Sequence, residues 1–107
     1  MKKQQLQKYE AQAKVLKALA HPTRLLILDE LSRKEHCVHE LTGMIGADMS
    51  TVSKHLSILK NAGIVGIDKR GTNVFYTLKI PCAVNFLVCT RDVMKARVKE
   101  QMKIING

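Results

Sequence analysis

Residues 38–63 decide the fold, and they read VHELTGMIGADMSTVSKHLSILKNAG. The first part, Val38–Ile45, fits a short helix that Gly46 closes. Asp48 suits the N-cap of a second helix, which ends where Gly63 can take a left-handed C′ conformation. The inward positions of this second helix are spaced by four and three residues: Val52, Leu56 and Leu59. Two short helices joined by a tight turn that contains glycine are typical of a helix-turn-helix.

Two helices are expected before this motif, and a hairpin and a long helix after it. An apolar stripe at helical spacing predicts the first helix: Leu6, Tyr9, Ala13, Leu16 and Ala20. The other of these two helices is expected to start near Pro22, because proline is tolerated in the first turn of a helix. It carries four leucines into the core: Leu25, Leu26, Leu28 and Leu31. Residues 64–78 predict a β-hairpin around the turn Lys69–Asn73, and Pro81 starts a last helix that runs to about Ile105.

The expected fold is therefore mainly α with a small β-hairpin, in the order α-α-α-α-β-β-α, a winged helix-turn-helix. One domain covers residues 1–107, because no repeat or Gly/Ser/Pro-rich linker divides the chain. The last helix carries a regular apolar stripe: Cys82, Phe86, Cys89, Val93 and Ala96. Further apolar residues widen this face beyond the need of a small core, which predicts a homodimer joined by the last and first helices.

The composition favours a polyanionic partner. The chain carries 18 Lys and Arg against 9 Asp and Glu, a net charge of +9, which raises the expectation of nucleic acid binding. Anionic membrane surfaces attract the same charge, but no membrane partner is expected. No apolar run approaches the roughly 20 residues that span a bilayer, which excludes a transmembrane protein. The N-terminus, MKKQQ, does not resemble a secretory signal, and three cysteines cannot all pair within one chain. A cytoplasmic protein with free thiols is expected.

The helix that Asp48 caps is expected to enter the major groove of double-stranded DNA with its outward face. Its short hydroxyls and flexible cations suit contacts to bases and phosphates, and the polar hairpin tip would reach a neighbouring groove. The expected DNA-binding residues are Ser50, Thr51, Ser53, Lys54, His55, Lys60, Lys69, Arg70 and Asn73. His21 and His36 are expected at the surface or in turns.

Four segments resemble the ArsR/SmtB family of bacterial and archaeal repressors. They are Leu19–Leu28 (LAHPTRLLIL), Val38–Leu41 (VHEL), Ser50–Val65 (STVSKHLSILKNAGIV) and Val74–Leu78 (VFYTL). The resemblance runs from about Ala13 to Leu78. It implies a homodimer that binds operator DNA and is released by an inducer, often a metal or metalloid ion, with the first and last helices at the dimer interface.

The same resemblance places Cys37 at the first cysteine of the family's metal-binding box. His39 stands where the second cysteine is usual, and imidazole can also ligate transition metals. Cys82 and Cys89 are further thiols, but seven helical residues separate sulfurs by about 10.5 Å along the axis. At that separation the two sulfurs cannot readily share one ion within a single helix. They could still do so if Cys82 lies in a non-helical segment after Pro81, or if Cys89 meets Cys82 of an antiparallel partner helix. Alternatively, either cysteine could meet Cys37.

These residues predict an inducer site for a thiophilic ion such as As(III), which is not required for folding. A redox or persulfide switch of the same thiols is the nearest alternative. Simple packing of buried cysteines and a winged helix with no inducer also remain open. An enzyme is not expected, since the sequence contains no phosphate-binding glycine loop, nucleophile elbow or His-Glu-x-x-His motif.

Overall fold

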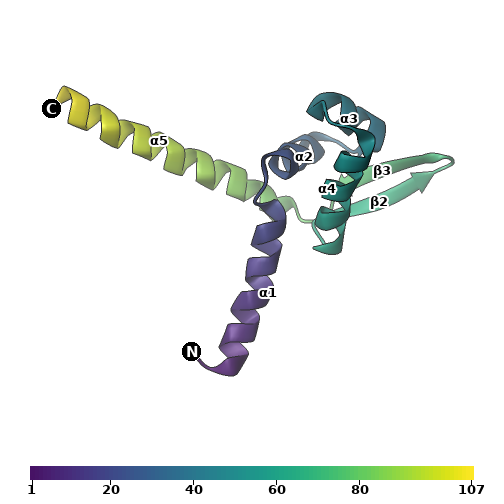
Figure 1. Ribbon diagram of the computed structural model, residues 1–107, viewed down its shortest axis with the longest axis horizontal. Coiled ribbons are helices and arrows are strands. Elements are labelled where there is room, and N and C mark those ends of the chain that lie inside the picture. The colour runs from purple at the N-terminus through teal and green to yellow at the C-terminus, as the bar shows by residue number, and fades with distance from the viewer.

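A computed structural model describes all 107 residues. The elements in chain order are α1 (Lys3–Leu19), α2 (Pro22–Arg33), β1 (His36–Cys37), α3 (Val38–Ile45), α4 (Met49–Asn61), β2 (Val65–Arg70), β3 (Asn73–Leu78), the 3-10 turn η1 (Pro81–Val84) and α5 (Asn85–Asn106). Helices α2, α3 and α4 gather beside the hairpin, while α1 and α5 project away from them (Figure 1). This arrangement confirms the winged helix-turn-helix.

The helix-turn-helix begins and ends as its sequence predicts. Gly46 and Gly63 both have left-handed backbones, with φ of 76° and 80°, at the ends of α3 and α4. The N–H of Gly46 donates to the carbonyl of Thr42 at 2.9 Å, and the N–H of Ile64 to that of Leu59 at 3.0 Å. Glycine adopts this conformation without a steric penalty, so each helix can stop within one residue.

The core lies between α2, α3, α4 and the base of the hairpin. Its largest fully buried apolar side chains are Ile27, Leu28, Leu41, Val52, Leu56, Leu59, Ile64 and Val65. The three inward positions expected on α4 are thus all buried. Burial of this apolar surface fixes the rotation of α4 about its own axis, and so decides which of its residues face the solvent.

The sheet has a third strand that the sequence did not indicate. Its order is β1-β3-β2, and both pairs are antiparallel. His36 and Cys37 in β1 pair with Tyr76 and Phe75 in β3. A strand of two residues is too short to show an alternating pattern, which explains why only the hairpin was predicted.

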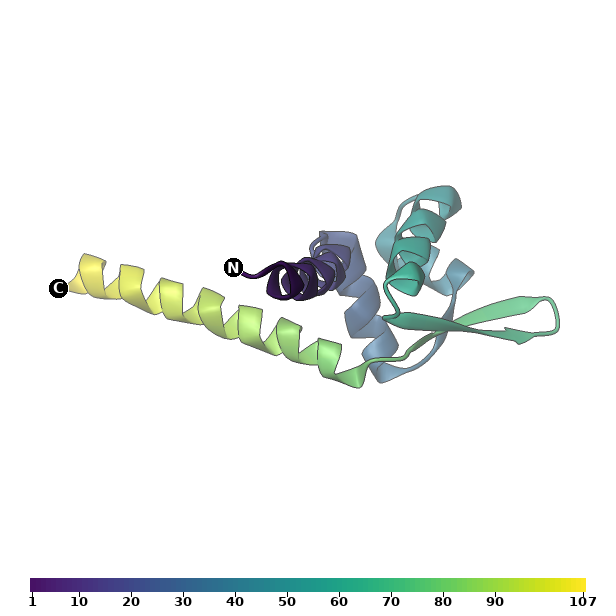
Figure 2. The same cartoon turned by 90° about the horizontal axis from the view of Figure 1, so that it is seen from below.

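Helix α5 and most of α1 lie outside the compact body, and only Ala18 and Leu19 at the end of α1 join the core. The molecule measures 61 × 42 × 22 Å, and the view turned by 90° shows α5 running past the rest of the chain as a long single rod (Figure 2). No residue of α5 is buried. The last helix was predicted to start at Pro81, but Pro81–Val84 form the 3-10 turn η1 and α5 begins at Asn85.

Candidate nucleic-acid interface

The exposed face of α4 carries a polar stripe. Ser50, Lys54, Ser57 and Asn61 are exposed and follow one another at steps of four, three and four residues, so they share one side of the helix. Ser57 was not among the residues predicted from the sequence. Ser57 could have been predicted from its helical spacing, seven residues after Ser50 and three after Lys54.

The start of α4 is fixed by Asp48. Its Oδ1 accepts hydrogen bonds from the N–H of Thr51 at 2.8 Å and from Oγ of Ser50 at 2.6 Å. These bonds, the one from Ser50 first, lower the pKa of Asp48 to about 2. The carboxylate of Asp48 therefore orients the hydroxyl of Ser50, and Ser50 remains exposed at the N-terminal end of the helix.

The other predicted residues of α4 differ in exposure. Lys54 and Lys60 are exposed, whereas Thr51 and Ser53 are half-buried. His55 does not lie on the exposed face. Its ring lies 4.4 Å from that of His21, centroid to centroid, and its Nδ1 is buried. His55 follows Val52 by three residues and precedes Leu59 by four, so it lies beside the buried stripe.

The two cations predicted at the hairpin tip have different surroundings. Lys69 is exposed and makes no ion pair, and Asn73 is exposed at the start of β3. Arg70 instead binds Glu35 and Asp68, with nitrogen-to-oxygen distances between 2.5 and 3.0 Å. Arg70, predicted to contact DNA, therefore already has its donors engaged by two carboxylates of its own chain.

The net charge is not concentrated on the winged body. Residues 1–20 and 80–107 contain 10 of the 18 Lys and Arg but only 3 of the 9 Asp and Glu. Residues 21–79 therefore carry a net charge of only +2. This distribution predicts that long-range attraction to a polyanion comes mainly from α1 and α5, and that any contact made by α4 is local.

Cys37 lies where three parts of the fold meet. It is the N-cap of α3, the second residue of β1, and the partner of Phe75 in the hairpin. Its Sγ and its N–H lie 3.3 and 3.4 Å from Oε1 of Glu40, which occupies the first turn of α3. A change at this thiol would therefore act directly on the start of α3 and on the base of the wing.

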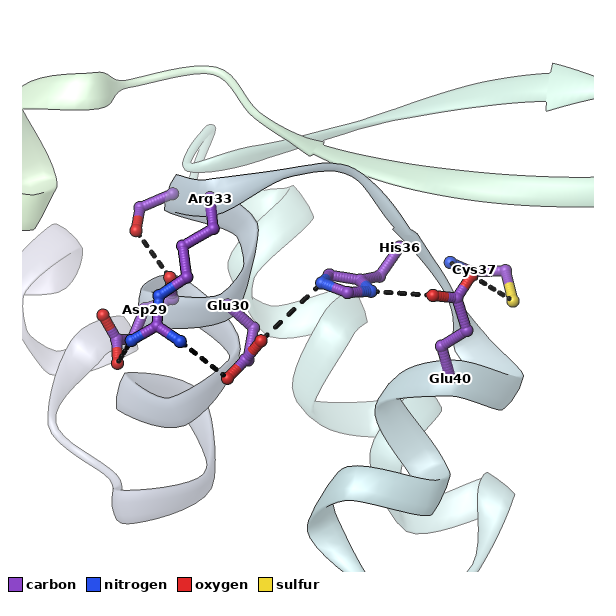
Figure 3. Close-up of polar contacts among 7 residues, drawn as sticks. Asp29, Glu30, Arg33, His36, Cys37 and Glu40 are labelled. Atoms are coloured by element: carbon purple, nitrogen blue, oxygen red, sulfur yellow. Dashed lines mark hydrogen bonds and ion pairs between the residues drawn. The ribbon is translucent and has the colours of Figure 1, made fainter.

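His36, expected at the surface or in a turn, is buried with 2% of its area exposed. Its Nδ1 lies 2.9 Å from Oε2 of Glu40, and its Nε2 lies 3.7 Å from Oε2 of Glu30 in α2. The carboxylate of Glu40 thus joins the imidazole to Cys37 (Figure 3). The bond from His36, followed by those from Cys37, lowers the pKa of Glu40. No periodicity in the sequence signals this contact between α2 and α3.

The predicted sensing residues are not brought together within one chain. Cys37 is half-buried, Cys82 and Cys89 are exposed, and His39 is exposed in the first turn of α3. No group of three or more His, Cys, Asp or Glu side chains is placed to hold a metal ion. Cys82 lies in η1 rather than in α5, so the spacing along one continuous helix does not apply to the pair.

The fold and the exposed helix define a DNA-binding protein of the winged helix-turn-helix class. Comparison with known proteins identifies the family. The model of the family described as "Bacterial regulatory protein, arsR family" matches residues 21–66. An HTH-type transcriptional regulator of Methanocaldococcus jannaschii is 35% identical over 102 residues, which are 94% of this chain and 98% of the relative.

Solved structures agree with this result. The homodimeric winged helix-turn-helix DNA-binding domain Mb0332 of Mycobacterium bovis has a TM-score of 0.78 at 26% identity, covering 94% of this chain and 93% of the other. Reduced HlyU of Vibrio cholerae has a TM-score of 0.70 at 36% identity, covering 78% and 93%. The chain belongs to the ArsR family of DNA-binding transcriptional regulators, which are not enzymes. None of its helices is long and apolar enough to cross a membrane.

Proposed function

We propose that this chain is a homodimeric transcriptional repressor that is released from operator DNA by chemistry at its thiols. The observation that carries this proposal is the position of Cys37 between α3 and the wing. Cys37 is the N-cap residue of α3, its Sγ donates to Oε1 of Glu40 in the first turn of that helix, and its backbone pairs with β3. A ligand or bond formed at Sγ would replace the contact with Glu40 and so disturb both elements that flank the recognition helix.

Homodimerisation is supported by the apolar surface that α1 and α5 leave uncovered. Leu16, Phe86 and Val93 are 48%, 45% and 60% exposed, and Leu16 and Phe86 line an apolar hollow between α1, α2 and α5. A second copy would cover this surface by the hydrophobic effect. Two copies related by a twofold axis would place their α4 helices about one DNA turn apart, which predicts a pseudo-palindromic operator.

The proposed inducer is a thiophilic ion such as As(III). A soft ion of this kind prefers thiolate ligands, and the three cysteines are the only thiols of the chain. Because one chain forms no complete cluster, the ligands would come from both subunits of the dimer, and the exposed thiols of Cys82 and Cys89 are open to a second subunit. His39 is exposed in the first turn of α3 and could replace one thiolate for ions that accept imidazole.

A titration of the DNA complex tests this proposal. The wild-type protein is bound to a duplex recovered from a random pool, and arsenite, zinc and cadmium are added in turn under reducing conditions. Release by arsenite that is lost in Cys37→Ser supports the assignment. Release that persists in the variant lacking all three cysteines, or no release by any ion, contradicts it.

Oxidation of the same thiols is the second candidate, and the exposure of Cys82 and Cys89 favours it. Two thiols would lose two electrons and two protons to an oxidant such as a polysulfide and form one disulfide. A polysulfide would then release DNA where metal ions do not, and a thiol reductant would restore binding. If neither treatment releases DNA and operator and random duplexes bind equally well, the chain is a winged-helix DNA binder with no inducer.

A further inference from the structure

The side chain of Arg70 crosses the small sheet from β2 to the segment that enters β1. Its guanidinium lies over the ring of Phe75 in β3, with Cζ 4.8 Å from the ring centroid. Beyond this ring, Nη1 and Nη2 donate to the two carboxylate oxygens of Glu35 at 2.5 and 2.7 Å. Nε and Nη2 also donate to Oδ2 of Asp68 at 3.0 and 2.8 Å. We call Arg70, Glu35 and Asp68 the wing clasp.

The register of the strands explains why these groups meet. Asp68 and Cys37 both pair with Phe75, on its two sides, and paired residues point to the same face of a sheet. Arg70 and Glu35 are two residues from Asp68 and Cys37, so they share that face by alternation. Lys69 lies on the opposite face for the same reason, although it is adjacent to Arg70 in sequence.

The clasp uses the donors that a DNA phosphate would need. A bidentate pair between guanidinium and carboxylate has fixed geometry and is stronger than a bond between neutral groups. The hydrogen bonds that Arg70 donates to Glu35 first, and then to Asp68, raise the pKa of Arg70. A phosphate would have to displace both carboxylates, each of which carries the same sign of charge as the phosphate.

The clasp also supports an element with few other contacts. The tip of the hairpin extends beyond the body (Figure 2), and all residues from Asp68 to Asn73 are exposed. A two-stranded ribbon is marginally stable by itself, so its direction depends on what ties it to the body. The bond between Arg70 and Glu35 joins residues 35 positions apart and is such a tie.

We propose that Arg70 is a positioning residue of the wing, which through Glu35 sets the direction in which the hairpin meets DNA, and that Lys69 makes the phosphate contact of the wing. This inference rests on DNA binding by the family and does not depend on an inducer. It assigns opposite roles to two adjacent cations, and it gives Glu35, an acidic residue outside the helix-turn-helix, a favourable effect on binding to a polyanion.

The test measures the affinity for a duplex recovered from a random pool, by fluorescence anisotropy, over a series of salt concentrations. Arg70→Gln and Glu35→Gln are each expected to weaken binding by about three- to tenfold, and the double variant no more than either alone, because all three lose the same contact. The salt dependence of log K should stay at the wild-type slope. Lys69→Gln is the matched control, and it should reduce the magnitude of the slope by about 0.9.

The sign of the Glu35→Gln effect decides between the two roles. Removing an acidic charge strengthens binding to DNA by long-range attraction, and it would also free Arg70 for a phosphate. Tighter or unchanged binding by Glu35→Gln would therefore overturn the proposal. A loss of about 0.9 in slope for Arg70→Gln would do so as well, since it would show that Arg70 neutralises a phosphate.

A charge-reversed pair guards against effects on folding. Arg70→Glu and Glu35→Arg should each weaken binding, and the variant that carries both, with unchanged net charge, should recover most of the affinity. Thermal unfolding followed by circular dichroism identifies any variant that does not fold. If the double reversal folds but binds no better than the weaker single variant, the clasp does not position the wing.

Discussion

The imidazole of His55 in α4 lies against that of His21 at the start of α2, with the ring centroids 4.4 Å apart. His21 also caps α2, because its Nδ1 accepts a hydrogen bond from the N–H of Thr23 at 3.0 Å. Burial first, and then the nearby His21 and Arg24, lower the pKa of His55 below 6.5. Helix α4 is thus held against the start of α2 by this contact between two imidazoles.

This contact predicts that stability depends on pH through His55. Since its pKa is lower in the folded chain, the unfolded chain takes up the extra proton below about pH 6.5, and folding becomes less favourable as the pH falls. The urea midpoint of the wild type should therefore drop more than that of His55→Phe between pH 8 and about pH 5. Equal losses in the two proteins would show that another group causes the dependence.

The cap of α4 predicts a second pH dependence, at lower pH. Asp48→Ala removes the acceptor for the N–H of Thr51 and should weaken both folding and DNA binding, whereas Asp48→Asn keeps an acceptor and should lose less. The stabilisation from the ionised carboxylate is present above about pH 3.8 and is lost as the pH falls through about 2. Urea unfolding at neutral and acid pH measures it. An Asn variant as unstable as the Ala variant would contradict the role of the cap.

Two glycines in the helix-turn-helix predict opposite effects of the same substitution. Gly63 has a φ of 80°, where an alanine is strained by about 1–2 kcal/mol, so Gly63→Ala should destabilise the chain by that amount. Gly43 lies within α3 at a negative φ with nothing within 4 Å of an added Cβ. Gly43→Ala should therefore stabilise it by about 0.5–1 kcal/mol. Urea unfolding measures the change in the free energy of unfolding for each variant. If both substitutions destabilise the chain, or both stabilise it, this explanation is contradicted.

Lys54 lies on the exposed stripe of α4 and is expected to contact DNA. Lys54→Gln should weaken binding and reduce the magnitude of the salt slope by about 0.9 if Lys54 neutralises one phosphate. Lys103→Gln, near the end of α5, is the control for net charge alone. Anisotropy titrations over a salt series measure both variants. Equal effects would show that the position of Lys54 on the recognition helix has no special importance.

The helix-turn-helix was predictable because its signals are local. Asp48 caps a helix whose inward residues recur at helical spacing, and Gly63 ends it, so chain order alone places α4. The exposed stripe could be predicted for the same reason. His55 was predicted on the exposed face of α4, although its spacing from Val52 places it beside the buried stripe. A polar residue in that position is expected to face solvent unless a partner is known, and the partner, His21, belongs to another helix.

The amino-acid sequence by itself determined the order of the helices, the turn between α3 and α4, the hairpin and the family, since each follows from periodicity, capping residues and recognisable segments. Only the tertiary structure decided that His55 rests on His21, that His36 is buried between Glu30 and Glu40, and that Arg70 is bound by Glu35. These contacts join residues from different elements, and their formation depends on how the packed core orients those elements. Periodicity describes one element at a time and carries no information on what faces it.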